Sequence, residues 1–185
     1  MLSLAFGILG LLNYRDSTGY DLTKIFADSL NNFWHAQSSQ IYRELNRMEE
    51  AGLVASRSII QNGRPNKRLY SITDAGRAAL SEWLCEAKPE IENPHHPMLV
   101  RVFFGANDPE ATLAMLKKYR EQCLRMLETN YAGIRQNIEN YAAIIPDGQE
   151  KSKYWLMTLD CGIAQTQAMA DWAEHCIVQI EKEMA

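Results

Sequence analysis

The sequence lacks any apolar run long enough to cross a membrane. Its longest run, residues 2–12, is preceded by no basic residue and followed by no small-residue cleavage site. A membrane-spanning helix needs about 20 apolar residues, and a secretory signal needs both of those flanking features. We therefore interpret this run as a buried helix, and we expect a cytoplasmic protein with no membrane partner.

The sequence also lacks the residue patterns of metal sites, disulfides and common enzymes. Its four histidines form neither H-x-x-x-H nor H-E-x-x-H, and no glycine-rich phosphate loop or G-x-S-x-G occurs. His95 and His96 stand between prolines and are interpreted as linker residues. Four separated cysteines form no C-x-x-C pair and are interpreted as small core residues: Cys85, Cys123, Cys161 and Cys176. We expect no metal, no cofactor and no enzymatic activity.

Positive charges are outnumbered in the chain as a whole but concentrated in one segment. The formal net charge is −4, yet residues 37–77 hold seven Lys or Arg and four acidic residues, a net of +3. One basic face on an otherwise acidic chain suits a protein that attracts phosphates at a single surface. Segments of this size often reach +3 by chance, so the charge alone does not identify a DNA-binding protein.

The first half of the chain has the periodicities of three helices, a hairpin and a fourth helix. The predicted helices span residues 3–14, 18–30, 38–51 and 74–86, and the predicted strands span 53–60 and 67–73. This order is that of a winged helix-turn-helix, an α+β unit whose β-hairpin is the wing. On the second and fourth helices, the residues expected to face the core are Tyr20, Leu22, Ile25, Phe26, Leu80, Trp83 and Leu84.

The second half of the chain is predicted to be helical. Three prolines at 89, 94 and 97 mark a linker, 87–97, between a DNA-binding domain at 1–86 and a second domain at 98–185. After a short apolar element at 98–104, one helix is predicted at 109–145 and another at 150–184. A short turn joins them into an antiparallel pair. The predicted fold class is therefore mainly α, with a winged N-terminal domain and a C-terminal helical dimerisation domain.

Long apolar stripes on these two helices predict a homodimer. The stripes at 124–145 and 156–184 are too long to be covered by an ~85-residue domain alone. On the final helix, the residues predicted to form the dimer contact are Leu156, Leu159, Ile163, Ala170, Ile177 and Ile180.

The third helix is predicted to read double-stranded DNA. In helix-turn-helix proteins this helix enters the major groove with its N-terminal half nearest the bases, which selects Ser38, Ser39, Gln40, Tyr42 and Arg43. Arg43 suits guanine and Gln40 suits adenine, whereas the hydroxyls of Ser39 and Tyr42 suit phosphates. At the hairpin tip, Arg64, Lys67 and Arg68 suit the DNA backbone or the minor groove. The alternative is a solvated helix face with Tyr42 half in the core, followed by a soluble charged turn.

Three motifs give the chain a resemblance to a known family. They are GYDL at 19–22, QIYRELNRMEEAGLV at 40–54 after Trp34, and RPNKRLYSITDAG at 64–76. Together they resemble the PadR family of bacterial transcriptional regulators. Beyond residue 90 the architecture resembles the longer-tailed branch, which includes virulence-gene activators and phenolic-acid-responsive repressors. The resemblance implies transcriptional control by a dimer whose C-terminal helices exchange across the two-fold axis.

The expected function is sequence-specific repression from a pseudo-palindromic operator, with a possible response to a small effector. The alternative is a winged-helix adaptor that binds proteins and does not recognise DNA sequence. A second apolar strip on the final helix comprises Trp155, Met169, Trp172 and Cys176. We favour its packing against the winged domain or the long helix; the other interpretation is a pocket for a flat aromatic effector.

Overall fold

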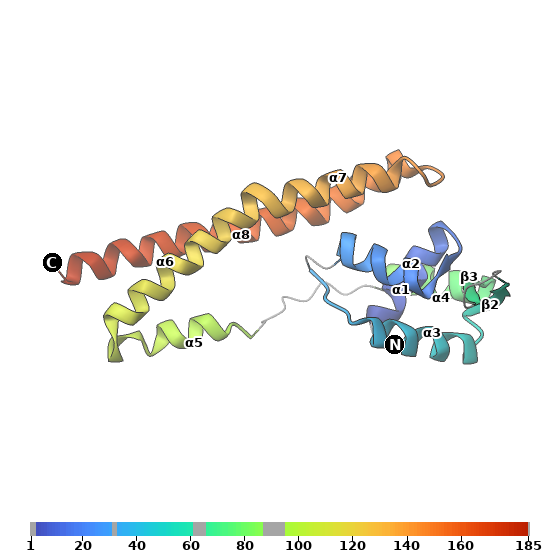
Figure 1. Ribbon diagram of the computed structural model, residues 1–185, viewed down its shortest axis with the longest axis horizontal. Coiled ribbons are helices and arrows are strands. Elements are labelled where there is room, and N and C mark those ends of the chain that lie inside the picture. The colour runs from blue at the N-terminus through green and yellow to red at the C-terminus, as the bar shows by residue number, and fades with distance from the viewer. Residues whose placement is uncertain (1–2, 31–32, 61–65, 87–94, 185) are drawn as a thin grey trace. The chain divides into compact units, whose positions relative to one another are not determined.

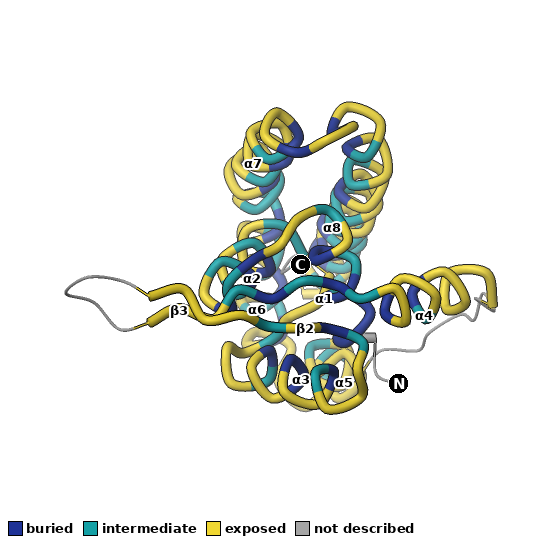
Figure 2. Tube along the Cα trace, turned by 90° about the vertical axis from the view of Figure 1, so that its right-hand side faces the viewer, coloured by how far each residue is buried: buried dark blue, intermediate teal, exposed yellow. Residues whose placement is uncertain are grey.

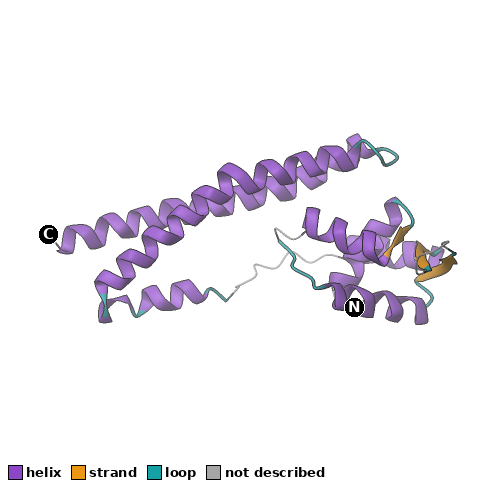
Figure 3. Cartoon of the chain, viewed as in Figure 1, coloured by secondary structure: helices purple, strands orange, loops and turns teal. Residues whose placement is uncertain are grey.

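A computed structural model describes residues 3–30, 33–60, 66–86 and 95–184. The chain forms two compact units, Met1–Pro89 with Asn140–Gln149, and Glu90–Glu139 with Glu150–Ala185. Most of the predicted linker at 87–97 lies outside the described residues, as does Arg64. Figure 3 shows that helices dominate the described chain and that the strands are confined to one small sheet. Among the described helices, none combines the length and apolar character needed to cross a membrane.

The N-terminal unit is a winged helix-turn-helix. In chain order its elements are α1 (Ser3–Tyr14), β1 (Ser17–Thr18), α2 (Gly19–Ile25), the π-helical turn η1 (Phe26–Leu30), α3 (Ser38–Glu50), β2 (Val54–Ile59), β3 (Lys67–Ile72) and α4 (Asp74–Cys85). The strands form an antiparallel sheet in the order β1-β3-β2. The predicted helices and hairpin are confirmed, whereas β1 was not predicted. A two-residue strand has no periodicity of its own, and it exists because Ser17 pairs with Tyr70.

Local chemistry sets the ends of these helices. The Thr18 hydroxyl accepts a hydrogen bond from the Asp21 amide, and the Thr73 hydroxyl accepts one from the Gly76 amide. Helix α3 is followed by Gly52, whose φ of 71° is the left-handed conformation that favours glycine. The starts of α2 and α4 and the end of α3 thus follow from capping residues in the sequence.

The core of this unit is built from the inner faces of its helices and sheet. Its largest fully buried side chains include Ile8, Leu9, Leu12, Leu22, Ile41, Leu45, Met48 and Val54. The prediction of burial is wrong for three residues. The exposed fraction is 71% for Tyr20, 40% for Trp83 and 61% for Leu84. Trp83 lies at the edge of the core, where its ring stacks on Phe6 with centroids 4.6 Å apart. Helical periodicity alone did not show where the narrow buried face of each short helix ends.

The rest of the described chain, residues 95–184, forms one long helix beside a succession of shorter ones, and residues 140–149 within it belong to the first compact unit. Its elements are α5 (Pro97–Phe103), the 3-10 turn η2 (Gly105–Asn107), α6 (Pro109–Arg125), the π-helical turn η3 (Met126–Asn130), α7 (Tyr131–Ala142) and α8 (Gly148–Met184). Helix α8 lies beside both α6 and α7 (Figure 1). The antiparallel pair is confirmed, but the continuous α-helix predicted at 109–145 is interrupted by η3 and ends at Ala142.

Two apolar clusters and three ion pairs join α8 to its neighbours. Leu116 of α6 packs against Ala173 and Ile177, whereas Tyr131 and Ile138 of α7 pack against Leu159. Figure 2 shows buried residues on the facing sides of α7 and α8. The ion pairs are Lys117–Glu181 at 2.6 Å, Arg120–Glu174 at 2.7 Å and Arg135–Asp160 at 3.3 Å.

Candidate nucleic-acid interface

Helix α3 has one buried face and one open face. Ile41, Leu45 and Met48 are at most 2% exposed, as predicted, whereas Ser38, Ser39 and Arg43 are exposed. Among the described residues, Arg43 has no ion-pair partner. A guanidinium that is held by no carboxylate is available to an incoming base edge or phosphate.

Gln40 already performs a structural task at the start of α3. Its side-chain oxygen accepts a hydrogen bond from the Gln37 amide at 2.8 Å, and Gln37 in turn caps the helix. This capping box stabilises the first turn of the helix that is predicted to enter the groove. The Gln40 amide group still has its two N–H donors, so base reading by this residue stays a prediction.

Tyr42 packs partly against α2 and is partly exposed to solvent. Its ring lies over the beginning of α2, where a Cβ added to Gly19 would come within 2.8 Å of the Tyr42 Cζ and nearer still to Cε1. The side chain nevertheless remains 44% exposed. The neighbouring Tyr20 is more open still and was missed as a surface residue, although the GYDL motif contains it. Both tyrosines thus have exposed side chains near the contact between α2 and α3.

The two described cations of the predicted wing site lie in different surroundings. Lys67 is exposed and has no ion-pair partner among the described residues. Arg68 is also exposed, with 48% of its side chain accessible, but it forms an ion pair with Glu49 of α3 at 2.5 Å and donates to the Ser56 hydroxyl of β2. Sequence reasoning found Arg68 but missed Glu49 and Ser56 as its partners.

A further wing cation, Arg57, was not among the predicted site residues. Arg57 pairs with Leu69 and Ile59 pairs with Lys67 across the β2–β3 ladder. Because side chains alternate along strands, Arg57 and Lys67 lie on the same face of the hairpin. Arg57 is exposed, so this face carries two cations.

The predicted dimer residues of α8 already have partners within their own chain. Leu159, Ala170 and Ile177 are buried, with Leu159 fully inaccessible. Leu156, Ile163 and Ile180 are only partly buried and retain exposed edges. Their contribution to a dimer stays a prediction, and in a dimer their exposed edges would supply the contact.

Three of the four predicted effector residues pack in two different apolar clusters. Trp155 packs in the cluster around Leu159, whereas Trp172 and Cys176 pack in the cluster around Leu116, and Met169 is half-buried. Trp155, Trp172 and Cys176 thus pack against neighbouring helices, and an effector role for the four residues stays a prediction. Burial raises the pKa of the Cys176 thiol, which keeps that side chain neutral and apolar.

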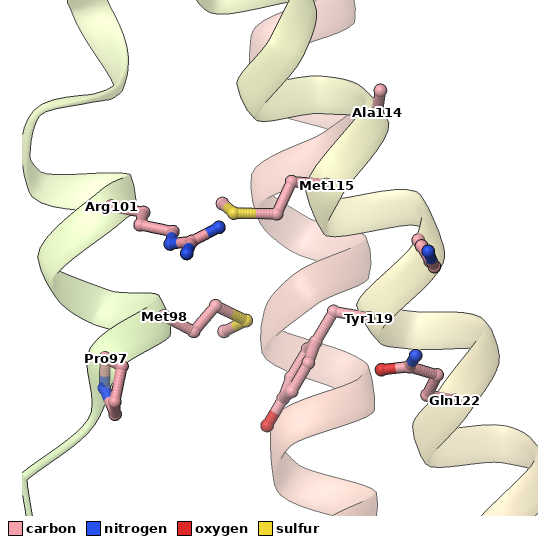
Figure 4. A pocket seen from close by; sticks show the side chains of 8 residues that line it. Pro97, Met98, Arg101, Ala114, Met115, Tyr119 and Gln122 are labelled. Carbon is pink, nitrogen blue, oxygen red and sulfur yellow. The ribbon is translucent and has the colours of Figure 1, made fainter.

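A hollow of about 460 Å³ lies elsewhere in the C-terminal unit, between α5 and α6. Met98 and Arg101 of α5 point toward Met115 and Tyr119 of α6 (Figure 4). Lys118 also lines this hollow, and neither it nor Arg101 has an ion-pair partner among the described residues. The lining therefore combines apolar side chains with two cations.

Comparisons with known proteins cover both units. Residues 8–82 match the model of the transcriptional regulator PadR-like family, and residues 95–181 match the model of the virulence activator alpha C-terminal region. The chain is 28% identical over 184 residues to the negative transcriptional regulator PadR of Bacillus subtilis, covering 97% of this chain and 98% of that protein.

Solved structures show the same architecture. The structure of B. subtilis PadR in complex with operator DNA matches with a TM-score of 0.81 at 24% identity. The match covers 97% of this chain and 99% of the PadR chain. The same regulator in complex with p-coumaric acid has a TM-score of 0.76 at 23% identity, with coverages of 96% and 95%. The Vibrio cholerae virulence activator AphA has a TM-score of 0.73 at 29% identity, with coverages of 98% and 99%.

Proposed function

The chain belongs to the PadR-like family of DNA-binding transcriptional regulators, and from this premise we propose that it represses transcription as a homodimer bound to a pseudo-palindromic operator. The open N-terminal half of α3, with Arg43 unpaired among the described residues, is the observation that carries the proposal. We place this activity in the cytoplasm, where bacterial DNA is accessible to it.

The recognition step follows from the two faces of α3. Its buried face anchors the helix to the core, so Arg43 and the N-terminal serines enter the major groove on a rigid support. Arg43 donates two hydrogen bonds to a guanine edge, and Ser38, Ser39 and Tyr42 donate to phosphate oxygens. Lys67 adds electrostatic attraction to the DNA backbone, whereas Arg64 lies outside the described residues and stays a predicted contact.

Dimerisation determines the form of the operator. A two-fold dimer presents two equivalent recognition helices, so each must meet an equivalent half-site. The match of residues 95–181 to the virulence activator C-terminal region supports a shared role for this helical unit. The exposed edges of Leu156, Ile163 and Ile180 are available to a second copy.

We propose that the protein represses transcription and responds to a small effector. The name of the B. subtilis relative describes a negative regulator, and its structure has been solved with p-coumaric acid. In this chain, the hollow between α5 and α6 offers apolar contacts from Met98 and Met115 and positive charge from Arg101 and Lys118. A small aromatic acid has the matching chemistry, with a flat apolar body and one negative charge.

Selection of DNA from a random library tests the proposed function. The full-length protein is expected to enrich a duplex with dyad symmetry and to bind it with an affinity that falls linearly on a log–log plot against salt. Fluorescence anisotropy between 50 and 300 mM salt (roughly the range in which counterion release is measurable) supplies the slope. If no duplex is enriched, and if association of the protein with DNA does not depend on salt, the result would instead support the protein-interaction adaptor.

A further inference from the structure

Arg68 of the wing is bound to the recognition helix α3. Arg68 Nη2 lies 2.5 Å from Glu49 Oε2 and 2.8 Å from the Ser56 hydroxyl oxygen, to which Arg68 Nε also donates at 3.1 Å. The Ser56 hydroxyl donates to Glu49 Oε1 at 2.6 Å. Three elements, α3, β2 and β3, therefore meet in one closed network, which we term the wing clamp and define as Glu49, Ser56 and Arg68.

Strand geometry explains why Arg68 and its neighbour Lys67 differ. Successive side chains point to opposite faces of a strand, so Arg68 shares its face with the buried Tyr70 and Ile72. This is the face that packs against the helices. Lys67 instead shares the opposite face with Arg57 of β2. Two adjacent cations that look equivalent in the sequence thus have different surroundings.

The contacts within the wing clamp oppose a direct phosphate contact by Arg68. A phosphate approaching the guanidinium would come close to the Glu49 carboxylate, and the two anions repel each other. The hydrogen bond from Ser56, together with Arg68, holds the pKa of Glu49 below its usual range, which keeps that carboxylate ionised. The Arg68 guanidinium also lies 5.3 Å from the centre of the Tyr70 ring, which restrains its position further.

We propose that the wing clamp fixes the wing relative to the recognition helix, and that Arg68 is a positioning residue for DNA binding that neutralises no phosphate. This inference rests on the proposed function and refines the role first expected for Arg68. Both α3 and the wing must contact the same DNA duplex. If their relative position is already fixed in the free protein, less conformational entropy is lost on binding. The wing clamp fixes this relative position through an ion pair between the end of α3 and the start of β3.

Charge-neutralising variants of the two clamp partners separate this role from simple electrostatics. If only net charge mattered, Arg68→Ala would weaken DNA binding and Glu49→Gln would strengthen it. The clamp predicts that both variants weaken binding, each roughly three- to tenfold, and that the double variant is no weaker than either single one. The log–log salt slope should stay at the parent value, because no phosphate contact is lost.

Two matched controls come from the same elements. Glu50→Gln removes an exposed carboxylate of α3 that lies next to Glu49 but outside the clamp, so it should leave affinity unchanged or raise it. Lys67→Ala removes the neighbouring wing cation and should lower the salt slope by about one unit. The probe is the duplex that the parent protein enriches from the random library.

Hydrogen exchange of the free full-length protein tests the clamp without DNA. Amides of β2 and β3 should exchange faster in Glu49→Gln and Arg68→Ala than in the parent, and should be unchanged in Glu50→Gln. The proposal is overturned if Glu49→Gln tightens DNA binding, if Arg68→Ala lowers the salt slope by about one unit, or if wing exchange stays at the parent rate. Failure of the parent to select DNA would contradict the proposed function, whereas the exchange result would still decide whether the clamp exists.

Discussion

At the scale of single residues, the recognition surface depends on a close approach between two helices. Gly19 begins α2 and lies against the Tyr42 ring, so any larger side chain at position 19 would overlap that ring. The glycine is needed for space and not for an unusual backbone angle. Gly10 of α1 provides the contrasting case, since a Cβ there would meet nothing within 4 Å.

We predict that Gly19→Ala lowers the free energy of unfolding by about 1–3 kcal/mol through overpacking. Gly10→Ala, its matched control, should instead raise it by up to about 1 kcal/mol, because alanine favours helix formation. Urea denaturation followed by circular dichroism measures both effects. Equal stability of the two variants would mean that Tyr42 moves aside without cost.

Arg43 is predicted to read a base. Its replacement by alanine should cost about 1–3 kcal/mol of operator binding and should relax the base preference at one position of each half-site. Competition among operators that differ at single base pairs measures this preference. Arg47 on the same helix pairs with Glu44 at 4.0 Å, and Arg47→Ala serves as the comparison. Unaltered selectivity in Arg43→Ala would assign base reading to another residue.

At the scale of secondary-structure elements, the π-helical turn η3 precedes Tyr131, a buried tyrosine whose hydroxyl bonds to α8. Tyr131 is 4% exposed, and its hydroxyl donates to the Gly162 carbonyl at 2.9 Å and is hydrogen-bonded to the Thr166 hydroxyl at 2.7 Å. A Cβ on Gly162 would lie 3.3 Å from the same ring. These contacts lock the start of α7 to the middle of α8.

Tyr131→Phe is expected to lower the free energy of unfolding by about 1–2 kcal/mol, because it leaves two polar groups of α8 without their partner. Tyr154→Phe is the matched control on α8, since the Tyr154 side chain is 70% exposed. Thermal unfolding of the full-length protein compares the two variants. A loss of the same size at both positions would indicate a general effect of removing the hydroxyl.

At the scale of the whole molecule, the two units are proposed to divide the work between DNA contact and dimerisation. A fragment ending near Lys88 retains α1 to α4 and lacks α5 to α8. We predict that this fragment is monomeric and binds the operator far more weakly than the full chain, because each half-site is then occupied independently. Circular dichroism establishes that the fragment is folded, and sedimentation gives its mass. A stable dimer of the fragment would assign dimerisation to the winged unit.

Effector control is expected to act through the hollow between α5 and α6. A ligand changes DNA affinity only as far as it binds the two states of the protein differently. Aromatic acids should change both tryptophan fluorescence and operator affinity of the parent, and Arg101→Gln should raise the concentration required. Lys117→Gln is the control, because Lys117 pairs with Glu181 and does not line the hollow. If a broad panel of acids changes neither signal, control by protein abundance replaces effector control.

Local rules within the sequence determined the order of the elements and most of their ends. Thr18, Thr73 and Gly52 act through hydrogen bonds or backbone angles within a few residues, so their effects on helix ends can be predicted from the sequence without knowledge of the fold. The apolar face of α3 was predictable for the same reason, since Ile41, Leu45 and Met48 follow the helical period.

Only the tertiary structure decided which side chains meet across the chain. The strand β1 exists through its pairing with β3, and the partner of Arg68 lies 19 residues away on another element. Similarly, the structure shows which stripe residues of α8 are buried against α6 and α7 and which retain exposed edges. Periodicity identifies the apolar face of a helix, but the depth of burial and the identity of a polar partner depend on distances between segments that the sequence does not contain.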